Sequence, residues 1–227
     1  MLIIGLTGGL ASGKNFVSSC FQRFRIPVFD ADLEVHKLLA GDQAVFKQIK
    51  SNFPQAILNG KINRKILGEN VFKDPQELKK LEQIIHPSLR RKEDLFIKNC
   101  RRNRQEIAIL NIPLLFERGG YRRCHKNIAV ITKTQSQFFR FRIRQKSKKN
   151  LANKNLGFDS NSETRLIYKE FNNITKHQTN NLQRAKLADF IIYNGLGKAF
   201  TFRQVKNLFI TIRFNNHNFI AKWPQKI

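Results

Sequence analysis

Cysteine is scarce in this sequence of 227 residues, and its three cysteines, Cys20, Cys100 and Cys124, form no C-x-x-C pair. The sequence therefore indicates neither a disulfide framework nor a zinc site, and we expect a reducing, cytoplasmic setting. The five histidines show no H-x-x-x-H spacing, so metal catalysis by protein ligands is not indicated. Long hydrophobic runs are missing as well, because none approaches the roughly eighteen residues that cross a bilayer. We therefore expect no membrane partner.

Acidic residues are also few. Sixteen Asp and Glu stand against 42 Lys and Arg, which gives a formal net charge of +26. This excess predicts attraction to polyanions or anionic substrates, but it identifies no site. A coding bias toward A and T is an alternative origin, because Lys, Asn and Ile are abundant together. Hydrophobic residues make up 41% of the chain, with 20 phenylalanines, so a core can form without disulfides or metal.

Five short apolar runs rich in β-branched residues predict strands at 2–6, 26–29, 107–112, 127–132 and 190–193. Their apolarity is continuous rather than alternating, which is typical of parallel strands covered on both faces. Longer stretches of mixed polar and apolar residues follow the runs. We therefore expect an α/β fold, with a parallel five-stranded sheet flanked by helices.

The segments between these runs differ in character. Residues 33–105 are helical in pattern and predict a helical insertion in the sheet. Within them, His86-Pro87 is typical of a turn before a helix. Residues 145–177 are rich in Lys, Asn and Ser and predict a mobile, solvated excursion. The apolar stretch at 200–212 predicts a last helix packed on the core.

A glycine-rich turn follows the first predicted strand and satisfies the pattern G-x-x-x-x-G-K. Glycines let consecutive backbone N–H groups curl around a phosphate, the following helix N-terminus adds partial positive charge, and Lys14 supplies a full one. The pattern predicts a phosphate-binding loop (P-loop) that includes Ala11, Ser12, Gly13, Lys14 and Asn15, with Phe16 in the helix that follows. The alternative is a chance glycine-rich turn between a strand and a helix.

Asn15 departs from the P-loop pattern, which has Ser or Thr at this position. The hydroxyl of that residue normally completes the coordination shell of Mg²⁺. An amide oxygen can take the same role directly or through a water, but its reach differs. We therefore expect weaker handling of Mg²⁺ or a compensating water.

Two acids, Asp30 and Asp32, follow the second predicted strand, at the edge of an α/β sheet where ligands gather. If the backbone is still extended there, carboxylates two residues apart point in a similar direction. One would then hold Mg²⁺ or its water while the other accepts a proton from an attacking hydroxyl. The alternative is a helix N-cap at Asp30 followed by an acid in the first helical turn.

With this loop and acid pair, the chain resembles the dephospho-coenzyme A kinase family along nearly its whole length. The motifs that carry the resemblance are Gly-Leu-Thr-Gly-Gly-x-x-Ser-Gly-Lys at 5–14, Asp-Ala-Asp at 30–32, Asn-Arg at 63–64, Leu-Glu-Gln-Ile-Ile-His-Pro at 81–87, Ile-Pro-Leu-Leu-Phe-Glu at 112–117, Gln137 with Arg140 and Arg144, Gln178 with Arg184, and Asn194-Gly195. A P-loop alone is shared by many unrelated proteins, whereas this ordered set is specific.

The resemblance implies transfer of the ATP γ-phosphate to the ribose 3′-hydroxyl of dephospho-coenzyme A (dephospho-CoA), the last step of coenzyme A synthesis, with Mg²⁺ as cofactor. It implies a P-loop kinase fold with three parts. These are a nucleotide-binding core at 1–32, 106–137 and 178–227, a helical acceptor-binding region at 33–105, and a lid at 138–177. ATP and dephospho-CoA would be the partners, and nucleic acid would not.

The resemblance also implies roles for single residues. Those expected to be catalytic are Asp32, Lys14 and Arg140. Those expected to bind ATP beside the P-loop are Arg144 and Asn194. Those expected to bind the acceptor are Arg64, His86 and Glu117. Those expected at the metal are Asn15 and Asp30.

Simpler explanations stay open for several of these residues. Arg140 and Arg144 are four residues apart and would equally form a solvated basic helix face. Glu117 would equally be a carboxylate at a helix start, and Asn194-Gly195 is typical of a tight turn. For the whole chain, the alternatives are another nucleoside or nucleotide kinase and a basic nucleic-acid-binding protein. The sequence does not indicate the oligomeric state.

Overall fold

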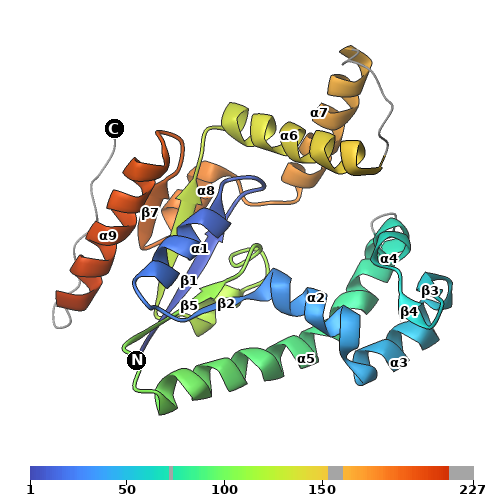
Figure 1. Cartoon of the computed structure of the whole chain (residues 1–227), viewed down its shortest axis with the longest axis horizontal. Coiled ribbons are helices and arrows are strands. Elements are labelled where there is room, and N and C mark those ends of the chain that lie inside the picture. The colour runs from blue at the N-terminus through green and yellow to red at the C-terminus, as the bar shows by residue number, and fades with distance from the viewer. Residues whose placement is uncertain (72–73, 153–160, 215–227) are drawn as a thin grey trace. The chain divides into compact units, whose positions relative to one another are not determined.

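The computed structural model describes residues 1–71, 74–152 and 161–214 of the chain (Figure 1). The chain divides into two compact units. The first combines Met1–Val28 with Glu106–Ile227, and the second is Phe29–Gln105. Within the described ranges, no helix combines the length and the apolar character that a membrane span requires.

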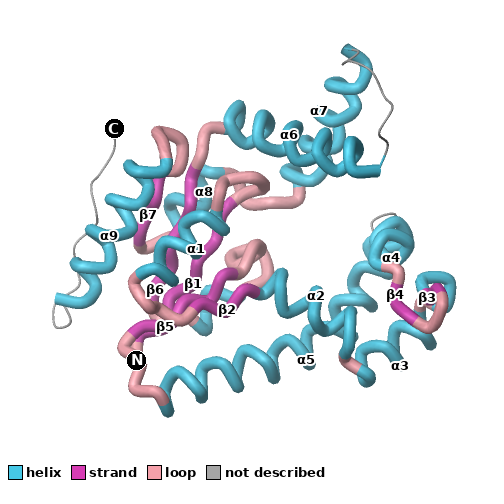
Figure 2. Tube along the Cα trace, viewed as in Figure 1, coloured by secondary structure: helices cyan, strands magenta, loops and turns pink. Residues whose placement is uncertain are grey.

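A parallel sheet forms the centre of the first unit (Figure 2). Its strands are β1 (Leu2–Gly8), β2 (Val28–Asp30), β5 (Ile107–Asn111), β6 (Lys126–Ile131) and β7 (Phe190–Tyr193). They are arranged in the order β2-β5-β1-β6-β7, and β1 pairs in parallel with both β5 and β6. The five predicted strands and the α/β fold are therefore confirmed.

Two helices complete the core of this unit. They are α1 (Lys14–Arg23) and α9 (Lys198–Phe214). Phe24 stacks on Phe202 and on Phe209, with ring centroids 5.4 and 5.1 Å apart. Ile4 and Val17 are fully buried in the same cluster. The predicted last helix is confirmed, and its packing fixes α1, whose N-terminus adjoins the P-loop.

Two further helices that pack on each other cover most of residues 138–177, the segment expected to form a lid. They are α6 (Thr134–Ala152) and α7 (Asn161–Lys176), which are followed by α8 (Asn181–Leu187); the turn η2 (Gly120–Arg123) precedes β6. The prediction of a solvated excursion is wrong for α7, because Ile167 and Phe171 are buried against Phe141. Ile167 and Phe171 are four residues apart, so they lie on the same side of α7 and form a narrow apolar face. The part of the predicted excursion at 153–160 lies outside the described residues.

The second unit is mostly helical, as the insertion was expected to be. Its elements are α2 (Ala31–Gly41), α3 (Gln43–Asn52), the 3₁₀ turn η1 (Pro54–Ala56), β3 (Ile57–Leu58), β4 (Lys61–Ile62), α4 (Arg64–Val71) and α5 (Pro75–Arg102). Leu38, Ile49 and Phe53 are almost fully buried at its centre. The hairpin β3–β4 is unpredicted because its strands have two residues each. Asn59-Gly60, both at positive φ, is nevertheless a typical hairpin turn.

Helix α5 continues through its internal proline. The turn expected at His86-Pro87 is therefore wrong, since both residues lie inside the 28-residue helix. Proline at this point removes one hydrogen bond of the helix. Ile84 and Ile85, before the proline, are buried in the core of the unit, and Leu89, after it, packs against the same core, so the helix is held on both sides of Pro87. His86 itself is exposed.

Candidate functional site

The P-loop connects the end of β1 to the start of α1 in a tight turn. Ala11 and Gly13 adopt the left-handed conformation, with φ of 55° and 89°. The Ser12 N–H donates to the Gly9 carbonyl at 3.0 Å, which closes the turn. The first N–H groups of a helix have no partner within the helix, so the start of α1 presents donors suited to a phosphate. The predicted strand, loop and helix are thus present.

Lys14 points its ammonium group toward the end of a neighbouring strand. The side chain is buried, and Nζ donates a hydrogen bond of 2.6 Å to Oδ1 of Asn111, the last residue of β5. Asn111 is fully buried. An uncharged acceptor at this position orients the ammonium group without neutralising it.

Asn194 supports the P-loop from the end of β7. Its Nδ2 donates to the Ser12 carbonyl at 2.8 Å, and its Oδ1 accepts from Thr201 at 3.1 Å. The Thr132 hydroxyl lies within hydrogen-bond distance of the carbonyls of both Ser12 and Asn194, at 2.8 and 2.7 Å. The side chain of Asn194, a residue that was expected to bind ATP, thus binds the backbone of the loop.

Gly13 fits against this support only because it lacks a side chain. A Cβ atom at residue 13 would lie 1.9 Å from Nδ2 of Asn194. The left-handed φ of 89° already disfavours any other residue. Glycine is therefore required at residue 13 for two reasons: the left-handed backbone conformation and the short distance to the Asn194 side chain.

Arg140 also contacts backbone carbonyls around the loop. It extends from α6, and its Nη1 donates to Ser12 at 3.1 Å while its Nη2 donates to Asn194 at 3.2 Å. This contact resolves the choice left by the sequence, since Arg140 is half-buried and does not belong to a solvated face. Arg144, one turn further along α6, is exposed.

Glu117 forms a buried ion pair that the sequence did not reveal. It lies in the turns after β5, so the alternative of a helix start is wrong. Oε1 accepts from the Thr179 N–H at 2.7 Å and from Nη2 of Arg184 at 3.2 Å. Burial alone would raise the pKa of Glu117, but hydrogen bonds from its own backbone and from Thr179, together with the charge of Arg184, lower it. Burial lowers the pKa of Arg184, which is 1% exposed.

The two acids at the end of β2 form a helix N-cap and a first-turn acid, which is the alternative arrangement given in the sequence analysis. Asp30 is the N-cap of α2, and its Oδ1 accepts from the Leu33 N–H at 3.0 Å. Asp32 lies in the first turn of this helix and is exposed. Because the backbone turns helical at Ala31, the expected common direction of the two carboxylates is wrong.

The residues predicted at the metal present few protein ligands. Asn15 is exposed in the first turn of α1, beside half-buried Phe16. In the described part of the chain, no group of three or more His, Cys, Asp or Glu could hold a metal ion.

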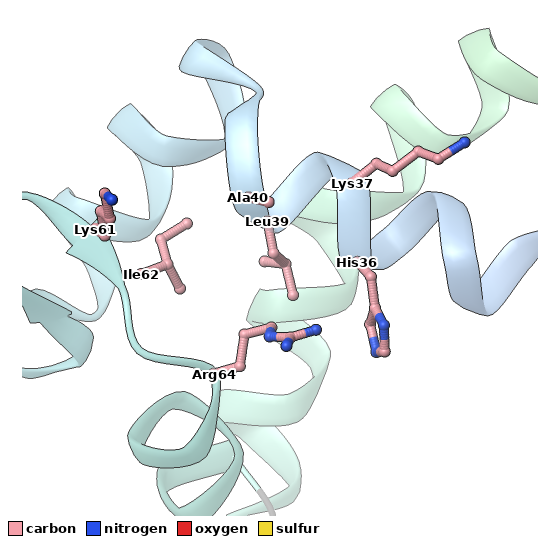
Figure 3. Close-up of a pocket in the computed structure, with 7 residues that line it drawn as sticks. All are labelled: His36, Lys37, Leu39, Ala40, Lys61, Ile62 and Arg64. Carbon is pink, nitrogen blue, oxygen red and sulfur yellow. The ribbon is translucent and has the colours of Figure 1, made fainter.

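A separate pocket of about 510 Å³ lies within the second unit (Figure 3). Its lining residues are His36, Lys37, Leu39, Ala40, Lys61, Ile62 and Arg64. Arg64, which was expected to bind the acceptor, is among them, whereas the Lys37 side chain points away and its Nζ donates to Glu34 at 2.7 Å. His86 is not among the lining residues.

Five further residues contact the loop or its supports, although the sequence analysis gave them no role. They are Asn111, Thr132, Gln137, Gln178 and Arg184. The signal available for Asn111 and Thr132 was a polar residue at the end of an apolar strand. Gln137, Gln178 and Arg184 were visible only as parts of motifs.

Comparison with known proteins assigns the chain to a family. A family model described as dephospho-CoA kinase matches residues 2–198. The dephospho-CoA kinase of Gluconobacter oxydans (strain 621H) is 32% identical over 213 residues, which cover 94% of this chain and 98% of that protein. The dephospho-CoA kinase of Wolbachia pipientis wMel is 29% identical over 214 residues, covering 94% and 100%.

Solved structures agree with the sequence comparison. TT1252 from Thermus thermophilus has a TM-score of 0.73 at 25% identity, covering 92% of this chain and 96% of that one. The dephospho-CoA kinase from Campylobacter jejuni has a TM-score of 0.64 at 26% identity, covering 95% and 98%. Together with the P-loop geometry, these matches show that the chain is a P-loop kinase that belongs to the dephospho-CoA kinase family.

Proposed function

We propose that this chain transfers the γ-phosphate of ATP to the ribose 3′-hydroxyl of dephospho-CoA. One observation carries the proposal: a P-loop with the buried Lys14, which departs from the pattern only at Asn15, lies in a chain that matches the family model over residues 2–198. In the transfer, the bond from the γ-phosphorus to its bridging oxygen breaks and a bond to the 3′-oxygen forms. ADP leaves, and the hydroxyl proton passes to a base.

The nucleotide end of the reaction depends on positioning and charge. Backbone N–H groups of residues 11–16 would hold the phosphates, and Lys14 would neutralise charge on the β- and γ-phosphates. Asn111 would keep its ammonium group aimed at them. Arg140 would act first as a support of the loop, since its guanidinium contacts loop carbonyls, and Arg144 would contact the nucleotide from the exposed face of α6.

The acceptor end would use the second unit. Asp32 would accept the proton of the 3′-hydroxyl or orient it, and its exposure leaves the carboxylate accessible to a substrate. Arg64 would bind an anionic group of dephospho-CoA, because its guanidinium is charged and it lines a pocket that Lys61 also lines. His86 would contribute from the exposed side of α5. Glu117 would assist by holding the Thr179 backbone.

Mg²⁺ would be held by Asn15, with Asp30 contributing through a water. The ion would bridge phosphate oxygens and neutralise the charge that develops during transfer. Because an amide replaces the usual hydroxyl, we expect Asn15→Ser to tighten binding of Mg²⁺ in the presence of ADP. Isothermal titration of Mg²⁺ into the ADP complex measures this without turnover, and equal affinities for parent and variant would refute the metal role of Asn15.

A phosphate-transfer assay across acceptors tests the proposal as a whole. With ATP as donor, dephospho-CoA should be phosphorylated, while nucleoside monophosphates should not. Phosphorylation of a nucleoside monophosphate with no product from dephospho-CoA would overturn the assignment. The proposed setting is the cytoplasm, which is supported by the three free cysteines, because free thiols persist in a reducing compartment.

A further inference from the structure

Leu10, in the turn of the P-loop, has both backbone polar groups paired with glutamine side chains. Its N–H donates to Oε1 of Gln178 at 2.9 Å, and its carbonyl accepts from Nε2 of Gln137 at 2.9 Å. Gln137 lies in the first turn of α6, and Gln178 lies two residues beyond the end of α7. The two ends of the lid helices therefore meet at one residue of the loop.

Close packing accompanies these hydrogen bonds. Gln137 is 5% exposed, and a Cβ atom on Gly9 would lie 2.8 Å from its Nε2. Leu10 and Ala11 belong to one apolar cluster with Phe141 of α6 and with residues of α7. The loop is thus fixed to the lid by both polar and apolar contacts, and a change in the position of the lid must act on it.

Gln178 is itself held in place by the buried ion pair. The next residue, Thr179, donates its N–H to Glu117 at 2.7 Å, and Glu117 is bound by Arg184. Arg184 is almost fully buried, so this anchor is rigid. The segment that presents Gln178 to Leu10 is therefore held by the turn after β5 and by α8, which are parts of the core.

We propose that Gln137 and Gln178 are positioning residues that hold the Leu10 peptide groups and through them couple the lid helices to the phosphate-binding loop. Neither side chain needs to touch the nucleotide. The inference rests on the proposed function, because it takes ATP as the ligand of the loop. Loss of one such bond leaves a partly buried backbone group unpaired and predicts about tenfold weaker binding of ATP.

Gln178 accepts its hydrogen bond from Leu10 whereas Gln137 donates its own, so the same substitution should affect the two residues differently. Gln178→Glu keeps an oxygen that accepts from the Leu10 N–H. Gln137→Glu replaces a donor with a carboxylate that faces the Leu10 carbonyl. Both variants add one negative charge, as does the control Gln135→Glu at an exposed position of the same helix.

Isothermal titration with ATP above neutral pH measures the outcome. Gln137→Glu should weaken ATP binding about tenfold, whereas Gln178→Glu and Gln135→Glu should stay within about twofold of the parent. The KM for dephospho-CoA should not change in any of them. Equal effects of Gln137→Glu and Gln178→Glu, or no effect of either, would overturn the proposal.

A second pair of variants decides the matter if thermal melting shows that Gln137→Glu does not fold. Gln178→Met is similar in length to glutamine but lacks the amide acceptor, so it should bind ATP more weakly than Gln178→Glu. Equal affinities would refute the positioning role. If the variants follow the predicted pattern but the parent does not phosphorylate dephospho-CoA, the proposed function fails and the inference stands. If the parent phosphorylates dephospho-CoA but the variants do not show the predicted differences in ATP affinity, the inference is refuted and the proposed function stands.

Discussion

The ammonium group of Lys14 and the side-chain oxygen of Asn111 are joined by a hydrogen bond of 2.6 Å, although 97 residues separate them in the chain. The pairing is possible because β1 and β5 are adjacent and parallel, so the end of one strand lies beside the loop that follows the other. The sheet thus positions the charge that the P-loop requires.

Asn111→Ala should therefore lower kcat/KM for ATP. A hydrogen bond to a charged group is worth about 1.5–3 kcal/mol, so the expected loss is about tenfold or more. Steady-state kinetics with ATP as the varied substrate measures it. Asn127→Ala is the matched control, because Asn127 is another buried strand asparagine but lies near the start of β6, whereas Asn111 is the last residue of β5. A similar loss in both variants would refute the orienting role of Asn111.

Gly13→Ala should abolish detectable binding of ATP. The added Cβ would collide with Asn194, and the left-handed conformation adds about 1–2 kcal/mol of strain. Gly119→Ala carries the same conformational strain, with φ of 67°, but meets no atom within 4 Å. Titration with ATP should show near-parental affinity for Gly119→Ala, and an equal loss in both variants would contradict the close-approach argument.

Much of the fold and of the loop could be predicted because their signals are local. Continuous apolar runs identified the five strands, and glycine spacing with Lys14 identified the loop. The supports of the loop could not be predicted in the same way, because Asn194 and Gln178 reach it only through tertiary packing. The sequence does not indicate which backbone group a polar side chain of one motif will bind in another motif.

Local signals also failed where packing outweighed composition. The Lys- and Asn-rich character of residues 145–177 concealed the buried side chains Ile167 and Phe171, whose stripe is too narrow to dominate the composition. The proline at 87 favoured a helix boundary, yet α5 continues because buried residues on both sides hold it. At Asp30, the helix N-cap arrangement prevailed over an extended pair of acids.

Glu117→Gln should destabilise the fold in a pH-dependent way. Removing one partner of a buried pair costs about 3–5 kcal/mol, because Arg184 is then left without its charged partner. The pKa of Glu117 is lowered from its ordinary value of 4.5, so its stabilising contribution is present above 4.5 and is lost as the pH falls through the lowered value.

Urea unfolding of parent and variant across this acidic range measures the effect. The difference in unfolding free energy should be largest near neutral pH and should shrink at pH values below 4.5. Glu69→Gln, at an exposed position of α4, serves as the control and should change stability by less than about 0.5 kcal/mol. A difference between parent and Glu117→Gln that does not vary with pH would refute the role of the carboxylate charge.

Arg64→Ala should raise the KM for dephospho-CoA while leaving the KM for ATP unchanged. Arg64 lines the basic pocket, and loss of a charged hydrogen bond predicts an increase of about tenfold. Lys65→Ala is the matched control, because Lys65 is the next exposed cation on α4 and is not among the lining residues. An increase confined to the KM for ATP, or one shared by Lys65→Ala, would contradict acceptor binding in this pocket.

The central proposal is that the P-loop holds ATP and that Asp32 accepts or orients the proton of the sugar hydroxyl. Its most direct test is formation of 3′-phosphorylated product from ATP and dephospho-CoA by the parent, Lys14→Ala and Asp32→Asn, with the ATP affinity of each measured in parallel. We predict that both substitutions abolish transfer and that only Lys14→Ala greatly weakens ATP binding. Parental rates of transfer in Lys14→Ala or in Asp32→Asn would contradict the account.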